Sequence, residues 1–297
     1  MTSLALSWFA RHEIRLAWRE WLAMMTGGRH KRRHAVIIGL LVFGGLLHIP
    51  AYAVIGRYAT LEAPLDKPAL IVMTATIFLA WALMLSQAIE SVTRVFYARS
   101  DLDLIMSSPV ALTNVFSVRL AAIALSITAM AMLLATPFVD VLIFGGGLRW
   151  LAVYGVVIAV GLTAAAVAIA ITILLFRTIG PRRTRFVAQI VAAVIGAGFV
   201  IALQIAAIMS YGTLSRFAVL TSDAAAGLAP GPDSMLWWPA RAALGDGEAL
   251  LLLLAFSLLL LGAVMAVFSA RFADTAVRAS TSTNATHRNC RRRAFRS

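Results

Sequence analysis

The sequence predicts an all-α, polytopic membrane protein with six transmembrane helices. Hydrophobic residues make up 61% of the chain, charged residues make up 13%, and the mean hydropathy is +0.88, far above a soluble domain. Six apolar stretches are each long enough to cross a bilayer core, which takes about 20 residues per helix. They are too long for barrel strands. The expected spans are Ala35–Ile55, Pro68–Ala88, Leu120–Phe144, Leu151–Phe176, Phe186–Met209 and Ala249–Ser269.

The distribution of Lys and Arg predicts that both termini are cytoplasmic. Of the 26 basic residues, 21 fall in segment 1–34, loop 89–119, loop 177–185 and the tail after residue 269. Basic residues are retained on the cytoplasmic side, so we expect a multi-pass protein of the cell inner (plasma) membrane. The excess of Arg over Lys suggests a bacterial source. Because topology and anionic lipid explain the net charge of +13, no nucleic-acid partner is expected.

Residues 1–34 are predicted to form a cytoplasmic amphipathic helix followed by a basic anchor. Arg15 and Arg19 lie off its apolar face, and Gly27-Gly28 is expected to end the helix. A helix with tryptophans on one side and basic residues on the other is typical of the membrane interface. The apolar positions at helical spacing are Ile14, Ala17, Trp18, Trp21, Leu22 and Met25.

The six spans occupy a predicted domain over residues 35–269, with two notable loops and a polar tail. Gly145–Gly147 predicts a tight external hairpin between the third and fourth spans. The external loop 210–248 contains the aromatic pair Trp237-Trp238, which favours a surface helix over a lid or a re-entrant segment. Residues 270–297 are rich in Ser, Thr, Asn and Arg and are expected to be disordered.

A short polar segment interrupts this apolar chain between the second and third spans. Ser100 and Asp103 fit a helix-capping pattern, Asp101 adds a second acid to the first turn, and Pro109 should stop the helix at Ser108. The resulting two turns are too short to be stable alone. By physical reasoning, a helix lying on its own membrane surface and a coupling helix in the groove of a cytoplasmic motor are equally good interpretations.

This segment resembles the "R-x-D-L-D-L-L-x-S-x-P" segment of permease subunits of type-2 ATP-binding-cassette exporters. The amphipathic leader also resembles the elbow helix of that family, and six spans with both ends inside fit its membrane domain. The resemblance implies that the segment contacts the motor and transmits nucleotide-driven movement. The residues concerned are Arg99, Ser100, Asp101, Leu102, Asp103, Leu104, Ile105, Ser107 and Pro109, with Ile105 as an apolar variant.

The resemblance implies a transporter without catalytic residues of its own. No G-x-x-x-x-G-K-[ST] phosphate loop occurs in the sequence, so ATP and Mg are expected on a separate ATP-binding-cassette ATPase subunit. The resembling permease is about twice as long, which implies a second permease half or a homodimer. The chain is then a half-size permease or a truncated half of a larger one. The alternative is a membrane interaction or assembly protein that does not transport.

Polar side chains within the spans are the remaining candidates for a site, because burial in a bilayer is costly without a partner. Gln87, Gln189 and Gln204 could line a translocation path, although hydrogen bonding between helices is the favoured interpretation. His48 is a further polar candidate, and Asp140 lies near the outer end of its span, where it can reach water. Few charges in the spans favour a lipid-like, peptide or hydrophobic drug cargo, and no bound metal or cofactor is expected.

Overall fold

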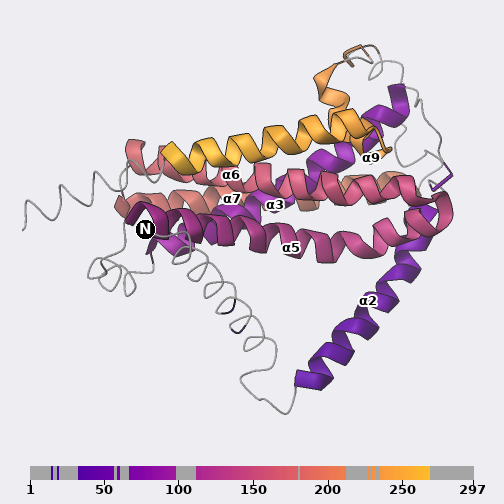
Figure 1. The fold of residues 1–297 in the computed structure, drawn as a ribbon, viewed down its shortest axis with the longest axis horizontal. Coiled ribbons are helices and arrows are strands. Elements are labelled where there is room, and N and C mark those ends of the chain that lie inside the picture. Colours follow the sequence, from indigo (N-terminus) through magenta and orange to yellow (C-terminus); the bar gives the residue numbers. More distant parts are fainter. Residues whose placement is uncertain are drawn as a thin grey trace, which may run out of the picture.

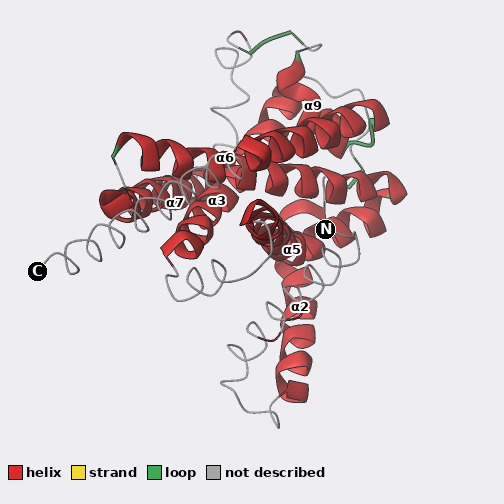
Figure 2. Ribbon diagram, turned by 60° about the vertical axis from the view of Figure 1, so that its left-hand side comes forward, coloured by secondary structure: helices red, strands yellow, loops and turns green. Residues whose placement is uncertain are grey.

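A computed structural model describes residues 33–56, 59–60, 67–97, 112–179, 181–211, 229–231 and 234–267, together with Arg15, Arg19 and Gly227. Within these residues the chain is made of helices and short turns, without a strand (Figures 1 and 2). Six of the helices are long and apolar enough to cross a membrane. The predicted all-α fold, with six helices that are long and apolar enough to span a membrane, is therefore confirmed for the described residues.

The long helices extend beyond several of the predicted spans. The second and third long helices both extend into the loop expected over 89–119. The link between these two helices is therefore confined to residues 98–111. Glycines end the third helix, as the predicted hairpin requires, and Gly147 has a φ of 88°. The long helices are α2 (Arg33–Ile55), α3 (Lys67–Tyr97), α5 (Leu112–Gly146), α6 (Ala152–Thr178), α7 (Pro181–Tyr211) and the C-terminal span Gly247–Val267.

Five of these helices form a bundle in which α3 and α6 are central, and α5, α7 and the C-terminal span pack around them (Figure 1). The tightest packing lies along α6, where small side chains let neighbouring backbones approach closely, as is common in membrane helix packing. Bulkier residues from α3 and α5 fill the spaces around them. The fully buried alanines of α6 are Ala164, Ala165, Ala166 and Ala168, and the larger buried partners include Ile89, Val92 and Leu120.

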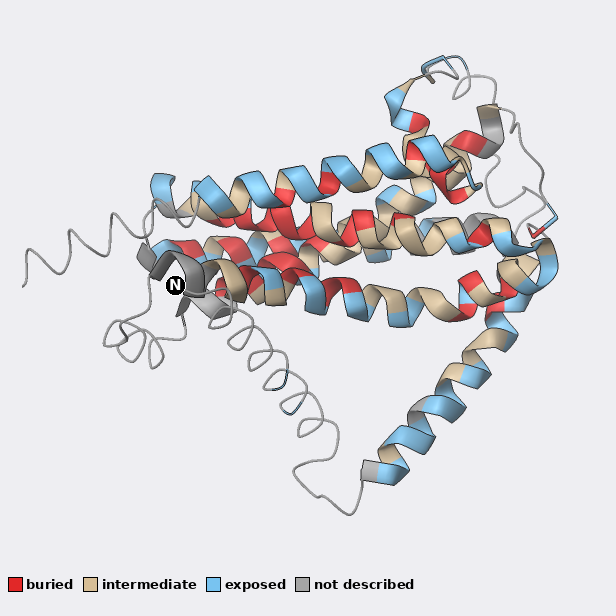
Figure 3. Cartoon of the chain, viewed as in Figure 1, coloured by how far each residue is buried: buried red, intermediate tan, exposed pale blue. Residues whose placement is uncertain are grey.

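Helix α2 stands apart from this bundle. It packs on α5 near its own C-terminal end and then diverges, so that most of its length carries exposed side chains (Figures 1 and 3). Ala51 is buried, whereas Leu41 and Phe43, further from the contact, are exposed. An apolar helix that is exposed along most of its length is compatible with contact with lipid.

The two ends of the bundle differ in how the helices connect. The linker end is where α3 ends at Tyr97 and α5 begins at Leu112, and α6 and α7 also meet there. The hairpin end is the opposite one, where α5 leads through Gly147 and the 3-10 helix η3 (Leu148–Leu151) into α6. The α2–α5 contact lies at the hairpin end.

A short structured element covers the hairpin end. It consists of the 3-10 helix η4 (Met235–Trp237) and helix α9 (Trp238–Ala243). A helix was predicted in this loop, but Trp237 does not face the membrane surface: its side chain is 2% exposed, it packs with Leu70 and Ala240, and its indole N–H donates to the Gly231 carbonyl at 2.8 Å. The aromatic residue that suggested a surface helix therefore anchors a cap on the bundle.

Three predicted features lie outside the described residues. These are the body of the amphipathic leader apart from Arg15 and Arg19, the segment 98–111 with its capping pattern, and the tail after residue 267. All three stay predictions.

Candidate functional site between three spans

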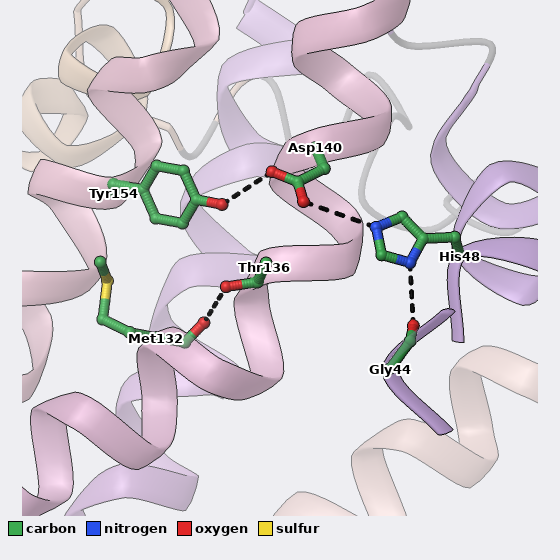
Figure 4. A network of polar contacts seen from close by, with 6 residues as sticks. All are labelled: Gly44, His48, Met132, Thr136, Asp140 and Tyr154. Atoms are coloured by element: carbon green, nitrogen blue, oxygen red, sulfur yellow. Dashed lines mark hydrogen bonds and ion pairs between the residues drawn. The ribbon is translucent and has the colours of Figure 1, made fainter. Parts of the chain in front are cut away.

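Three spans contribute polar side chains to one network near the hairpin end (Figure 4). Tyr154 of α6 donates its hydroxyl hydrogen to Asp140 Oδ1 at 2.9 Å. The other carboxylate oxygen, Oδ2, lies 3.5 Å from Nε2 of His48 on α2. The side chains of His48 and Asp140 are 37% and 31% exposed, so the network is accessible from outside the protein. Ionisable groups inside spans mark functional sites more often than they serve packing alone.

The second ring nitrogen of His48 is held within its own helix. Nδ1 lies 2.8 Å from the Gly44 carbonyl oxygen, which accepts a hydrogen bond from it. The imidazole therefore links α2, through Gly44, to α5, through Asp140.

Local structure explains why these residues meet. Asp140 lies six residues before the end of α5, about 9 Å along a helix with a rise of 1.5 Å per residue, and Tyr154 lies just inside the start of α6. The tight turn at Gly147 reverses the chain between them, which places the two side chains at the same depth. Thr136, one turn before Asp140, bonds to its own helix through the Met132 carbonyl at 2.8 Å.

A second contact, which we call the Ala59 clamp, fixes the end of α2 at the same end of the bundle. The Ala59 carbonyl accepts two hydrogen bonds, from the Trp150 indole N–H at 3.0 Å and from Nη2 of Arg149 at 3.2 Å. The guanidinium of Arg149 also lies 5.6 Å from the Trp150 ring centroid. Only glycine fits at position 146, because a Cβ there would overlap the Ala59 carbonyl oxygen.

The cap over the hairpin end is tied to the C-terminal span by a charged turn. Arg241 of α9 donates through Nε and Nη2 to Asp246 Oδ2, at 3.0 and 2.7 Å. Asp246 Oδ1 accepts from the backbone N–H groups of Glu248 and Ala249, both at 3.1 Å, and so caps the first turn of the span. The hydrogen bond from Ala249, followed by the contact with Arg241, lowers the pKa of the Asp246 carboxyl below its ordinary value.

The predicted site residues fall into two groups. The coupling segment, from Arg99 to Pro109, lies outside the described residues. Gln87 lies on α3, Gln189 and Gln204 lie on α7, and all three side chains are exposed. The hydrogen bonds between helices that we expected from these glutamines are not seen within the described part of the chain. The structure does not bring the glutamines together with the network around Asp140.

Sequence reasoning noted His48 and Asp140 separately but did not pair them, and it missed Tyr154 and the Ala59 clamp. The two paired residues are 92 positions apart in the sequence. The available signal was that the first, third and fourth long apolar stretches each place an ionisable residue near the same predicted end. The register that brings them into contact depends on the turn at Gly147 and on the angle of α2.

The described residues contain no group of three or more His, Cys, Asp or Glu side chains that could hold a metal ion. Comparison with known proteins adds no relative: no family model matches the chain, and neither a curated protein nor a solved structure is significantly similar to it. Function must therefore be argued from the sequence motif and from the geometry described above.

Proposed function

We propose that this chain is the membrane-spanning permease subunit of an ATP-driven exporter, working with a separate ATP-binding-cassette ATPase on the cytoplasmic side. The segment from Arg99 to Pro109 is the contact with that ATPase. The permease binds no nucleotide itself, and ATP binding by the partner changes which side of the membrane the transport path faces.

The observation that carries this proposal is the position of the motif between two helices of the main core. The link 98–111 joins α3 directly to α5. On either side of the link, Ile89 and Val92 of α3 and Leu120 and Ala124 of α5 are buried in one cluster with the alanines of α6. Close-packed cores transmit strain, so a push on this link reaches the centre of the bundle.

The charges of the described helices support a cytoplasmic position for the linker end. Arg119 lies two turns into α5, Arg177 lies at the end of α6, and Arg183 and Arg185 lie near the start of α7, all towards the linker end. The hairpin end has fewer basic residues in the described elements. By the retention of basic residues on the cytoplasmic side, the motif faces the compartment that supplies ATP.

Helix α2 is the element best placed to move. It is held to α5 at one end, by the Ala59 clamp and by the contact between His48 and Asp140, and it has few packing partners elsewhere. We therefore propose that α2 changes its angle to the bundle during transport, with its hairpin end as the pivot. A lipid-like or otherwise hydrophobic cargo suits the apolar surfaces that such a movement uncovers.

The test is purification of the chain from its native membrane in mild detergent, followed by identification of partners and an ATPase assay. The double variant Asp101→Lys/Asp103→Lys reverses two charges of the motif. We expect an ATPase subunit to co-purify with the wild type and to be lost from the double variant.

Two controls make the result specific. Glu248→Lys reverses a charge at the opposite end of the bundle and should leave the ATPase bound. Membrane insertion of each variant is checked by its yield in the detergent extract. A well-inserted wild-type protein with no ATPase partner would overturn the proposal and favour a membrane interaction protein without transport activity.

A further inference from the structure

The contact between His48 and Asp140 is one of the few ties between α2 and the bundle, and both of its members are titratable. Nε2 of His48 lies 3.5 Å from Oδ2 of Asp140, and the Tyr154 hydroxyl holds the other carboxylate oxygen at 2.9 Å. Three helices therefore converge on one carboxyl group, as Figure 4 shows. Ionisable groups inside spans commonly belong to ion or proton paths.

The position of Asp140 along α5 places this contact within reach of water. α5 has 35 residues, which gives a length of about 52 Å, whereas the hydrocarbon core is about 30 Å thick. Both ends of α5 can therefore extend past the core. Asp140 lies only about 9 Å from the hairpin end of the helix, and the side chains of both Asp140 and His48 are partly exposed. The pair can exchange protons with the solution at that end.

Both nitrogens of the His48 ring lie beside oxygen atoms that accept hydrogen bonds. Nδ1 is 2.8 Å from the Gly44 carbonyl, and Nε2 is on the side of the Asp140 carboxyl. A neutral imidazole carries one N–H, whereas an imidazolium carries two. Beside an ionised Asp140, the imidazolium can donate to both acceptors and adds charge attraction to the carboxylate. The neutral ring can donate to only one of the two.

The other ties of α2 do not respond to pH near neutrality. Ala51 packs through its methyl group, and the Ala59 clamp uses a carbonyl, an indole and a guanidinium. Histidine is the side chain whose ordinary titration falls between about pH 5 and about pH 8. Lysine, arginine and tyrosine ordinarily titrate above that range. On the described parts of α2, α3, α5, η3 and α6, the other titratable or charged side chains at the hairpin end are Tyr52, Lys67, Arg149 and Tyr154.

We propose that His48 and Asp140 form a proton-binding site whose occupancy sets the angle between α2 and the bundle. With a proton bound, the imidazolium donates to Asp140 and holds α2 against α5. When the ring gives this proton to water, its remaining N–H stays with the nearer Gly44 carbonyl, which belongs to α2 itself. The tie to Asp140 is then released. The proton comes from the solution at the hairpin end and returns to it.

This inference goes beyond the proposed transport function and needs only that α2 is free to change its angle. It adds the proton concentration at the hairpin end as a second input to the movement of α2. The response is measured on the purified chain without any ATPase. A positive result therefore stands even if no ATPase partner is found, and a negative result leaves the contact with the ATPase to be tested separately.

The experiment follows the position of α2 in the full chain as the pH is changed, in lipid nanodiscs that let the solution reach both ends of the bundle. Spin labels at Leu41→Cys and Leu125→Cys, with Cys290→Ser, report the distance between α2 and α5, and both positions are exposed. A polar contact between membrane helices is strong enough to change a population ratio by about threefold. We expect the ratio of attached to detached α2 to fall about threefold between about pH 5 and about pH 8.

Variants assign this response to the pair. His48→Gln cannot gain a charge in this pH range, so its distance distribution should be the same at both pH values. Asp140→Asn removes the negative partner and should also abolish the response. The matched control is His34→Gln, which replaces an exposed histidine at the other end of α2 and should respond like the wild type. Labels at Leu125→Cys and Leu259→Cys should show an unchanged distance within the bundle.

Two results would overturn the proposal. A wild-type distribution that is the same at both pH values would show that no bound proton controls α2. A response that persists in His48→Gln would place the titrating group elsewhere in the chain.

Discussion

Helices α2 and α6 are both long, apolar and free of acidic residues, yet they have opposite places in the structure. Within their membrane-spanning windows, 6% of the residues of α2 are buried, against 56% of those of α6. The difference lies in side-chain size. α6 carries a run of alanines in its centre, whereas α2 carries exposed bulky residues such as Leu41 and Phe43.

The comparison shows that overall hydrophobicity does not decide which helix of a membrane protein is central. Without water to drive apolar side chains together, helices associate through close backbone approach and through polar contacts. In α6, neighbouring backbones approach closely along most of the helix. In α2, the contacts are polar and are concentrated at its hairpin end. A central helix and a peripheral helix can therefore arise from sequences of similar apolar character.

The largest expected effect comes from disrupting the packing of α6. Ala168 is fully buried, so Ala168→Leu should overpack the core and destabilise the bundle by about 1–3 kcal/mol. In α2, Gly45 is exposed and a Cβ there would meet nothing within 4 Å, so Gly45→Leu should leave stability nearly unchanged. Thermal unfolding in detergent compares the two variants. Equal losses would contradict the distinction between the two helices.

The next effect concerns the Ala59 clamp. Gly146→Val places side-chain atoms where the Ala59 carbonyl lies, so α2 should lose its fixed end and the angle between α2 and α5 should vary more widely. Spin labels at Leu41→Cys and Leu125→Cys, with Cys290→Ser, report this as a broader distance distribution. Gly39→Val, which meets nothing within 4 Å, is the control. An unchanged distribution in Gly146→Val would show that the clamp does not hold α2.

A smaller effect is expected from the pair of His48 and Asp140. In a double-mutant cycle with His48→Leu and Asp140→Asn, the coupling free energy should be about 0.6 kcal/mol and no more than about 1.7 kcal/mol, the range measured for hydrogen bonds between membrane helices. Unfolding in detergent supplies the four stabilities. Thr76, which bonds within its own helix, provides a control cycle of Thr76→Val with Asp140→Asn. A coupling free energy no larger than in that control would show that the contact between His48 and Asp140 does not stabilise the fold.

An effect of comparable size is expected at the cap of the C-terminal span. The folded-state pKa of Asp246 lies below the ordinary value of 3.8. The stabilisation of the folded state by the Asp246 carboxylate is therefore complete above pH 3.8. This stabilisation is lost as the pH falls through the lowered pKa. Asp246→Ala should cost about 1 kcal/mol at neutral pH, the usual effect of removing a helix cap, and the difference from wild type should shrink in acid. A difference that stays constant on acidification would contradict the role of the carboxylate.

Much of this fold could be predicted from the sequence, because bilayer thickness constrains each span separately. Stretches such as Leu151–Phe176 had the required length and composition, and the glycines at 145–147 predicted the hairpin. The helix ends were less predictable. α3 runs nine residues beyond the predicted end of its span, because a helix that leaves the bilayer core is limited by capping and packing rather than by hydrophobicity.

The candidate site was less accessible to sequence reasoning. The glutamines were identified as polar groups in spans, but whether a polar side chain faces a neighbouring helix or the outside depends on packing that hydropathy does not encode. Gln189 faces outward, while Ala192, three positions later, accepts a bond from Ser86. The contact between His48 and Asp140 also required the angle between α2 and α5, and hydropathy does not encode that angle. The Ala59 carbonyl, which packs against Gly146, is one of the contacts that hold this end of α2.

The movement of α2 during the nucleotide cycle can be measured directly. Spin labels at Leu41→Cys and Leu125→Cys report the distance between α2 and the bundle, and labels at Leu125→Cys and Leu259→Cys report a distance within the bundle. With the ATPase partner bound, we expect ATP to shift the first distance while the second stays fixed. An α2 distance that is the same with and without ATP would contradict the proposal that α2 pivots on a fixed bundle.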